Sequence, residues 1–112
     1  MLEEIKNQFY SSTLKELQLL CQQLCRAFLQ AEELDSLVNS VLSISHQISG
    51  TGPMLGFDQT SKLSKKVEKT FVDIRSGEKS LTPQVLQQTQ RAFDAMIQTL
   101  NDENNRKLIS LE

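Results

Sequence analysis

The chain has 112 residues, of which 38% are hydrophobic and 23% charged, and its formal net charge is −2. This length suits one domain with a modest core, and the slightly acidic balance argues against nucleic acid as the main partner, since proteins that bind phosphate backbones normally carry a basic excess. No apolar stretch approaches the roughly 20 residues that span a bilayer, and no signal-peptide pattern opens the chain. We therefore expect a cytoplasmic protein that does not insert into a membrane.

The N-terminal third of the chain predicts two helices. Apolar residues at a spacing of three or four indicate a short first helix over residues 2–10. Thr13-Leu14-Lys15-Glu16 then has the pattern of a capping box, which predicts the start of a second helix at Thr13. The apolar stripe of that helix extends to about Gln30 and consists of Leu14, Leu17, Leu20, Cys21, Leu24, Cys25 and Phe28.

Three further helices are predicted in the rest of the chain. The first has Leu34, Leu37, Val38, Val41, Leu42, Ile44 and Ile48 as its core face. The second begins near Asp58 or Thr60, either of which can cap it, and ends at Ser76-Gly77. The third has Thr82 as N-cap and Pro83 at its first position. The residues predicted to face the core are Leu63, Val67, Phe71 and Ile74 on the second of these helices. On the third they are Val85, Thr89, Ala92, Phe93, Met96 and Leu100.

Long amphipathic helices with short connections predict an all-α fold, an antiparallel four-helix bundle with a short extra N-terminal helix. We expect a single domain over residues 1–110, while residues 111–112 can be a cloning remnant.

The two cysteines, Cys21 and Cys25, lie four residues apart on one predicted helix face. Helix geometry disfavours a disulfide between them. We expect both to be small buried hydrophobes in a reducing compartment. With a single histidine elsewhere in the chain, no metal site and no cofactor are expected.

The stretch SHQISGTGPMLG, residues 45–56, contains the only histidine and three of the four glycines. At about 100° per residue, His46 falls roughly 130° from the direction of the apolar face, which predicts that it faces water. Gly50 follows one turn later on the same side. Glycine inside a helix costs about 1 kcal/mol relative to alanine, so its presence suggests room for another protein to approach the ring. An exposed imidazole nitrogen is a nucleophile that can be phosphorylated, although a plain surface histidine is the simpler interpretation.

The spacing of this stretch resembles the signature of histidine-containing phosphotransfer (HPt) domains. That signature has a histidine, then a lysine and a glycine three and four residues later, small residues, a leucine and a second glycine. The residues in register with it are His46, Gly50, Leu55 and Gly56. On the following helix, Leu63 and the Val67-Glu68 pair resemble the family's leucine and leucine-glutamate positions. The similarity covers residues 14–100, and the predicted helices agree in number and length with the family's bundle.

Two residues depart from the family pattern. Ser49 stands where the family has a lysine that helps to neutralise the phosphoryl group, and its hydroxyl is a weaker substitute. By register, Lys65 is the nearest replacement cation and Lys69 the reserve, although a lysine-rich helix face is more often simply solvated. Gly52-Pro53 replaces the more usual Ala-Gly. Because Pro53 has no amide hydrogen, the helix is expected to end or kink about one turn after His46.

Other residues of the stretch have two open interpretations each. Gln47 and Ser45, beside His46, either hydrogen-bond a phosphoryl oxygen or are plain exposed polar residues. Met54, Leu55 and Phe57 either close the end of the bundle or form a docking patch. Gly56 is expected to end the turn before the next helix.

The resemblance implies a phosphorelay intermediate. Such a domain accepts a phosphoryl group on a ring nitrogen of His46, by family analogy Nε2, from a receiver-domain aspartate and passes it to another receiver. The implied partners are receiver domains of response regulators or hybrid histidine kinases. The implied Mg²⁺ is on the receiver, and the chain itself is a phosphocarrier rather than an independent enzyme. It is either a free cytoplasmic protein or a domain of a membrane-anchored hybrid kinase.

The alternative is a four-helix interaction module without phosphotransfer, either a degenerate HPt-like domain or an unrelated adaptor. Ser49 favours the degenerate case. A metal hydrolase in a helical bundle would need several histidines and clustered carboxylates on facing helices, which the single histidine excludes.

Overall fold

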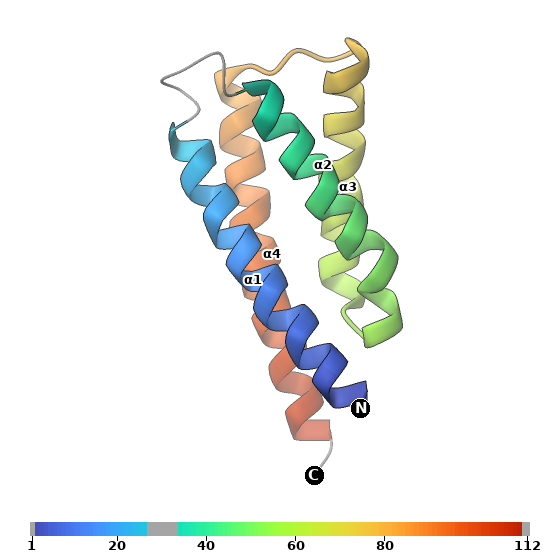
Figure 1. Cartoon of the computed structure of the whole chain (residues 1–112). Helices are drawn as coiled ribbons and strands as arrows, with labels where there is room; N and C mark the ends of the chain where they lie inside the picture. Colours follow the sequence, from blue (N-terminus) through green and yellow to red (C-terminus); the bar gives the residue numbers. More distant parts are fainter. Residues whose placement is uncertain (1, 27–33, 111–112) are drawn as a thin grey trace.

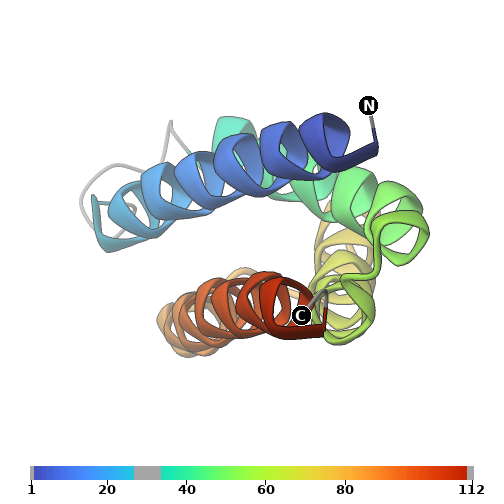
Figure 2. The same cartoon turned by 90° about the horizontal axis from the view of Figure 1, so that it is seen from below.

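The computed structural model describes residues 2–26 and 34–110, which contain helices and turns but no strand. The elements are α1 (Leu2–Arg26), α2 (Leu34–Thr51), the short 3₁₀ helix η2 (Pro53–Leu55), α3 (Asp58–Ser76) and α4 (Pro83–Ser110). Consecutive long helices run in opposite directions (Figure 1). Seen along the bundle, they follow one another around the core in the order α1, α2, α3, α4 (Figure 2). The predicted all-α antiparallel four-helix bundle is therefore confirmed.

The prediction of a separate short N-terminal helix is wrong. Helix α1 is continuous over 25 residues, and Thr13, predicted as an N-cap, is 4% exposed within it. The physical reason is that one buried face runs through the proposed break, because Phe9 and Leu17 on either side of Thr13 both belong to the core. The N-terminal part of α1 is also tied to α4, where the Tyr10 hydroxyl donates to Asn101 Oδ1.

The core faces predicted for the other helices are largely confirmed. Leu34, Leu63, Ile74 and Ala92 are partly buried at the edge of the core. Hydrophobic residues with no more than 2% exposure occupy all four long helices and the turn before α3: Leu17, Leu24, Val41, Ile48, Phe57, Phe71, Phe93, Met96 and Leu100. Cys21 is half-buried and its Sγ donates to Asp94 Oδ1 on α4 (3.8 Å). Phe28 and the side chain of Cys25 lie outside the described residues, as does the pair at 111–112.

The turn between α2 and α3 is built around Gly52. Its amide donates to Ile48 O (2.8 Å), and its carbonyl accepts from the Phe57 amide (2.9 Å). A Cβ at Gly52 would overlap Ser61 Oγ and lie 2.6 Å from Ile48 O, so only glycine fits. Helix α2 ends at Thr51, which confirms the prediction from Pro53. Gly56 has φ 88°, a conformation that glycine adopts without strain.

The predicted capping of α3 by Asp58 or Thr60 is wrong. The N-cap is Phe57, which makes no side-chain capping hydrogen bond. Instead, the buried Glu103 carboxylate on α4 accepts from the amides of Gln59 (3.1 Å) and Thr60 (2.9 Å) and from Thr60 Oγ1 (2.7 Å). A carboxylate supplied by another helix therefore satisfies the first amides of α3.

The predicted end of α3 and the predicted start of α4 are confirmed, while the helix end predicted near Gln30 lies outside the described residues. Helix α3 stops at Gly77, which has φ 88°. Helix α4 begins at Pro83, and Thr82 Oγ1 accepts from the Val85 amide (3.2 Å). Within the described part of the chain, no helix is both long enough and apolar enough to cross a membrane.

Candidate functional site

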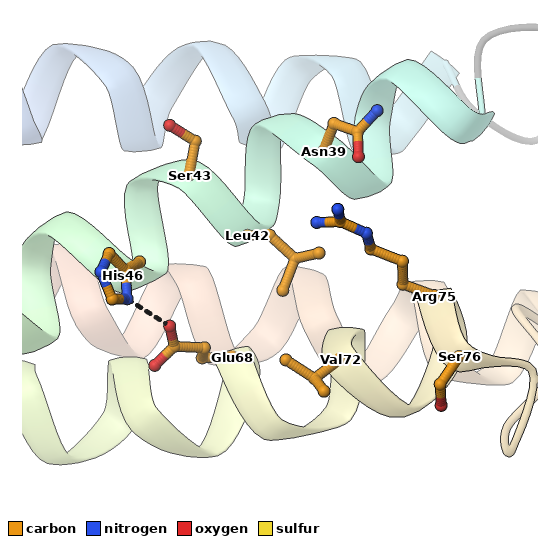
Figure 3. Close-up of a pocket in the computed structure, with 8 residues that line it drawn as sticks. All are labelled: Asn39, Leu42, Ser43, His46, Glu68, Val72, Arg75 and Ser76. Carbon is orange, nitrogen blue, oxygen red and sulfur yellow. Dashed lines mark hydrogen bonds and ion pairs between the residues drawn. The ribbon is translucent and has the colours of Figure 1, made fainter.

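The imidazole of His46 projects from α2 into solvent beside α3. Its side chain is 85% exposed, whereas Glu68, the residue opposite on α3, is 24% exposed. His46 Nδ1 and Glu68 Oε2 are 3.0 Å apart, and this contact bridges the two helices (Figure 3). The sequence-based expectation of a solvent-facing ring agrees with this position.

The contact with Glu68 distinguishes the two ring nitrogens. An ionised carboxylate is only an acceptor, so Nδ1 must donate its hydrogen to Oε2. In the neutral ring the Nε2 lone pair is then available for reaction. The arrangement consequently presents one nucleophilic nitrogen, held in a fixed ring orientation, on an open surface.

Serines hold α2 close against α3 beneath His46. Ser64 Oγ donates to Ser45 O (2.8 Å), and the Ser61 hydroxyl, which donates to Phe57 O at the start of its own helix (2.7 Å), also lies 3.2 Å from Ile48 O. Ser45 itself has no exposed surface, so its interpretation as an exposed polar residue is wrong. The reason is its direction, since Ser45 lies one helical step of about 100° from His46 and faces α3.

Ser49 lies partly buried on the same side of α2. Its Oγ is shielded from solvent, as is that of Ser45, and neither has a hydrogen-bond partner within the described residues. The Ser49 hydroxyl is thus turned into the helix interface rather than displayed beside the ring. A phosphoryl group on Nε2 would meet no exposed hydroxyl from this position.

The other predicted site residues surround the ring on the surface. Gly50 and Gln47 on α2 are exposed, and a Cβ at Gly50 would meet nothing within 4 Å. The fold therefore does not require glycine at this position. Lys65 and Lys69 are both exposed on α3, and by helical register Lys65 lies one turn before Glu68 on the edge that borders α2.

A groove extends from the His46–Glu68 pair along α2 and α3. Its apolar floor is Leu42 and Val72, and its far end is formed by Arg75 together with Asn39. Figure 3 shows the Arg75 side chain reaching from α3 towards Asn39. Among the described residues, no group of three or more histidine, cysteine or acidic side chains is arranged to hold a metal ion.

The chain is thus an all-α bundle that displays one exposed imidazole, in contact with a carboxylate, on an open helix face. In a comparison with protein families, the model of the Hpt domain matches residues 4–103. The chain belongs to the Hpt domain family. Comparisons with curated proteins and with solved structures found no match.

Membership of this family gives the general function. Hpt domains take part in histidine phosphotransfer within phosphorelays, as phosphocarrier modules that interact with receiver domains of two-component systems. The sequence-based interpretation of the chain as a phosphorelay component is confirmed at this level.

The contact of Glu68 with the His46 ring was not predicted from the sequence. The Val67-Glu68 pair was recognised as similar to a family position, but no contact with His46 was predicted. His46 and Glu68 are 22 positions apart in the sequence, and they come into contact only because α2 and α3 pack antiparallel. The available signal was the position of Glu68 on the predicted third helix, one turn after Ser64 on the face towards α2.

Proposed function

We propose that the chain is a phosphorelay intermediate that receives a phosphoryl group on His46 Nε2 from the aspartyl phosphate of one receiver domain and passes it to the aspartate of another. The observation that carries the proposal is the exposed ring whose Nδ1 contacts Glu68 Oε2 at 3.0 Å, because it leaves Nε2 as the accessible nucleophile. The proposed setting is the cytoplasm, as a free protein or as part of a larger signalling protein.

The proposed chemistry is an in-line displacement at phosphorus. The Nε2 lone pair forms the P–N bond, the P–O bond of the acyl phosphate breaks, and its electron pair leaves with the receiver's aspartate carboxylate. The ring becomes positively charged as the P–N bond forms. The Glu68 carboxylate at Nδ1 offsets that charge while it keeps the Nδ1 hydrogen in place.

Residues near the ring have distinct proposed roles. Gly50 leaves the next turn of α2 open for the receiver, since no other side chain of the described residues lies within 4 Å of the position of its missing Cβ. Lys65, with Lys69 as the reserve, supplies positive charge to the phosphoryl oxygens from α3. Gln47, which is exposed beside His46, is an additional hydrogen-bond donor. The Mg²⁺ that assists transfer is held by the receiver's acidic pocket, and the proposal assigns no cofactor to this chain.

The test is transfer of labelled phosphate from receivers. A panel of receiver domains is charged with ³²P-acetyl phosphate, repurified and mixed with the chain. The wild type is expected to acquire an acid-labile, base-stable label, which His46→Gln abolishes. If no receiver labels the wild type, or if His46→Gln is labelled equally, the proposal is wrong.

A second candidate, a module that binds receivers without passing phosphate, is favoured by one observation. Ser49 occupies the position of the family lysine and its Oγ is shielded from solvent. A Ser49→Lys variant separates the two candidates. If the chain is a phosphocarrier, we expect the wild type to acquire label and Ser49→Lys to raise the rate of labelling by roughly threefold to tenfold. That increase corresponds to about 0.7–1.4 kcal/mol of added stabilisation of the phosphoryl charge in the transition state. For a binding-only module, label appears in Ser49→Lys but not in the wild type.

A further inference from the structure

The groove that begins at His46 continues away from Gly50, toward the start of α2 and the end of α3. Its floor combines Leu42 with Val72, which is 50% exposed. A half-exposed valine in the wall of a groove is a favourable site for an apolar partner side chain. Because His46 lines the same groove, a protein that reaches the ring also covers this floor.

A second groove lies on the other side of α2 and joins the first. It runs between α1 and α2, shares Asn39 and Ser43 with the first groove, and contains Leu19, which is 49% exposed. The exposed ridge of α2 therefore has an apolar patch on each flank. The opposite end of the site offers less apolar surface, because Leu55 and Phe57 are buried and Met54 is the one large hydrophobic side chain exposed among the described residues there.

A positive charge closes the far end of the first groove. Within the described residues, the only ion pair is His46–Glu68, so the Arg75 guanidinium has no carboxylate within 4 Å. Arg75 lies seven residues beyond Glu68, about 10 Å along α3. Figure 3 shows the Arg75 side chain reaching towards Asn39, at the other end of the groove from the His46–Glu68 pair. The charge is therefore available to a carboxylate of a partner protein at the far end of the groove.

We propose that Leu19, Leu42, Val72 and Arg75 form the docking surface for the receiver domain, and that Arg75 contributes to the choice of receiver. The partner that fits presents an apolar patch to α1–α3 and a carboxylate to the Arg75 end of the groove, while its phosphorylated aspartate faces the His46 end. The inference rests on the proposed phosphotransfer function. It places the receiver over the groove that leads from His46 to Arg75, and it assigns no main contact to the surface around Met54.

Glutamine substitutions test this surface with matched controls, because glutamine removes apolar contact or charge and retains good helix propensity. The test variants are Val72→Gln, Leu19→Gln and Arg75→Gln. The controls are Ile5→Gln, which is 52% exposed on α1, Met54→Gln, which is 81% exposed, and Arg91→Gln on the exposed side of α4. The probe is an unphosphorylated receiver that accepts phosphate from the wild type in the panel described above, and its Kd is measured by isothermal titration.

We expect Val72→Gln to raise the Kd about tenfold, and Leu19→Gln and Arg75→Gln about threefold to tenfold, while each control changes it less than about twofold. The effect of Arg75→Gln should shrink as salt rises, because a charged contact is screened. All variants should be phosphorylated on His46 by phosphoramidate, which needs no docked receiver, at the wild-type rate.

The outcomes separate the two proposals. If wild type exchanges phosphate with a receiver but the Kd responds to Met54→Gln and not to Val72→Gln, the docking inference is wrong and the phosphotransfer proposal stands. If no receiver exchanges phosphate with the wild type, both are wrong. If sedimentation shows a wild-type dimer that Val72→Gln dissociates, the surface belongs to a second copy of the chain and the docking inference is again overturned.

Discussion

Glu103→Ala is expected to destabilise the bundle far more than an ordinary single substitution. The carboxylate is 8% exposed and accepts three hydrogen bonds, from the Gln59 amide, the Thr60 amide and Thr60 Oγ1. Alanine leaves these donors without their partner. Because Thr60 has no exposed surface, water does not readily replace the carboxylate at its two donors.

The magnitude follows from those contacts. Each buried donor left unsatisfied costs about 1–3 kcal/mol, and the better-hydrated Gln59 amide adds about 0.5–1 kcal/mol as an ordinary lost helix cap. We therefore expect Glu103→Ala to lower the free energy of unfolding by about 2.5–7 kcal/mol, which for a domain of this size lowers Tm by roughly 10–40 °C. Glu103→Gln keeps one acceptor oxygen and should cost about half as much.

The assay is urea denaturation followed by circular dichroism, with Asp102→Asn as the matched control. Asp102 is the neighbouring acidic residue and is exposed, so its substitution should change stability by less than about 0.5 kcal/mol. A loss below about 1 kcal/mol for Glu103→Ala, at an unchanged m-value, would refute the argument that the carboxylate caps α3.

Substitutions at three further positions probe the site and the turn beneath it. Gly52→Ala should destabilise by about 2–4 kcal/mol in urea denaturation, because the new methyl group overlaps Ser61 Oγ and a backbone carbonyl. Gly50→Ala should instead stabilise the fold by about 0.5–1 kcal/mol, since its Cβ has open space. Gly50→Gln should slow labelling of His46 by a receiver, because its long side chain obstructs the receiver, and should leave labelling by phosphoramidate unchanged. Glu68→Gln should slow phosphoramidate labelling of His46 about fivefold, because a neutral acceptor replaces a charged one in a contact that is partly screened by solvent; an unchanged rate contradicts the role given to the carboxylate.

The helices could be predicted from the sequence because their signals are local. The apolar periodicity of α2 and the Thr82-Pro83 start of α4 depend on neighbouring residues only, and both are confirmed. The capping box at Thr13 failed for the opposite reason. The same residues also fit the interior of a longer helix, and packing of Phe9 and Leu17 into the common core decides in favour of continuity.

The exposure of His46 was also a local property, since the helical period fixes which way it faces. The contact of His46 with Glu68 and the capping of α3 by Glu103 are not local properties. Each joins residues at least 22 positions apart, and each depends on how far one helix slides along another. Amphipathic patterns give the face that a helix buries but not its axial register, because sliding by one turn preserves the apolar contact.

The axial register of α3 connects these two contacts. A shift of α3 by one residue moves it about 1.5 Å, enough to stretch a 3.0 Å contact between His46 Nδ1 and Glu68 Oε2 beyond hydrogen-bonding distance. Glu103 holds the first turn of α3, so loosening that turn should release the ring about two turns further along. Glu103→Gln, studied well below its Tm, should therefore lower the population of the Nδ1–H tautomer of His46, as measured by ¹⁵N chemical shifts of the ring. Asp102→Asn should leave those shifts unchanged. A folded Glu103→Gln variant with the wild-type tautomer ratio would mean that the α2–α3 serine contacts alone fix the register of the site.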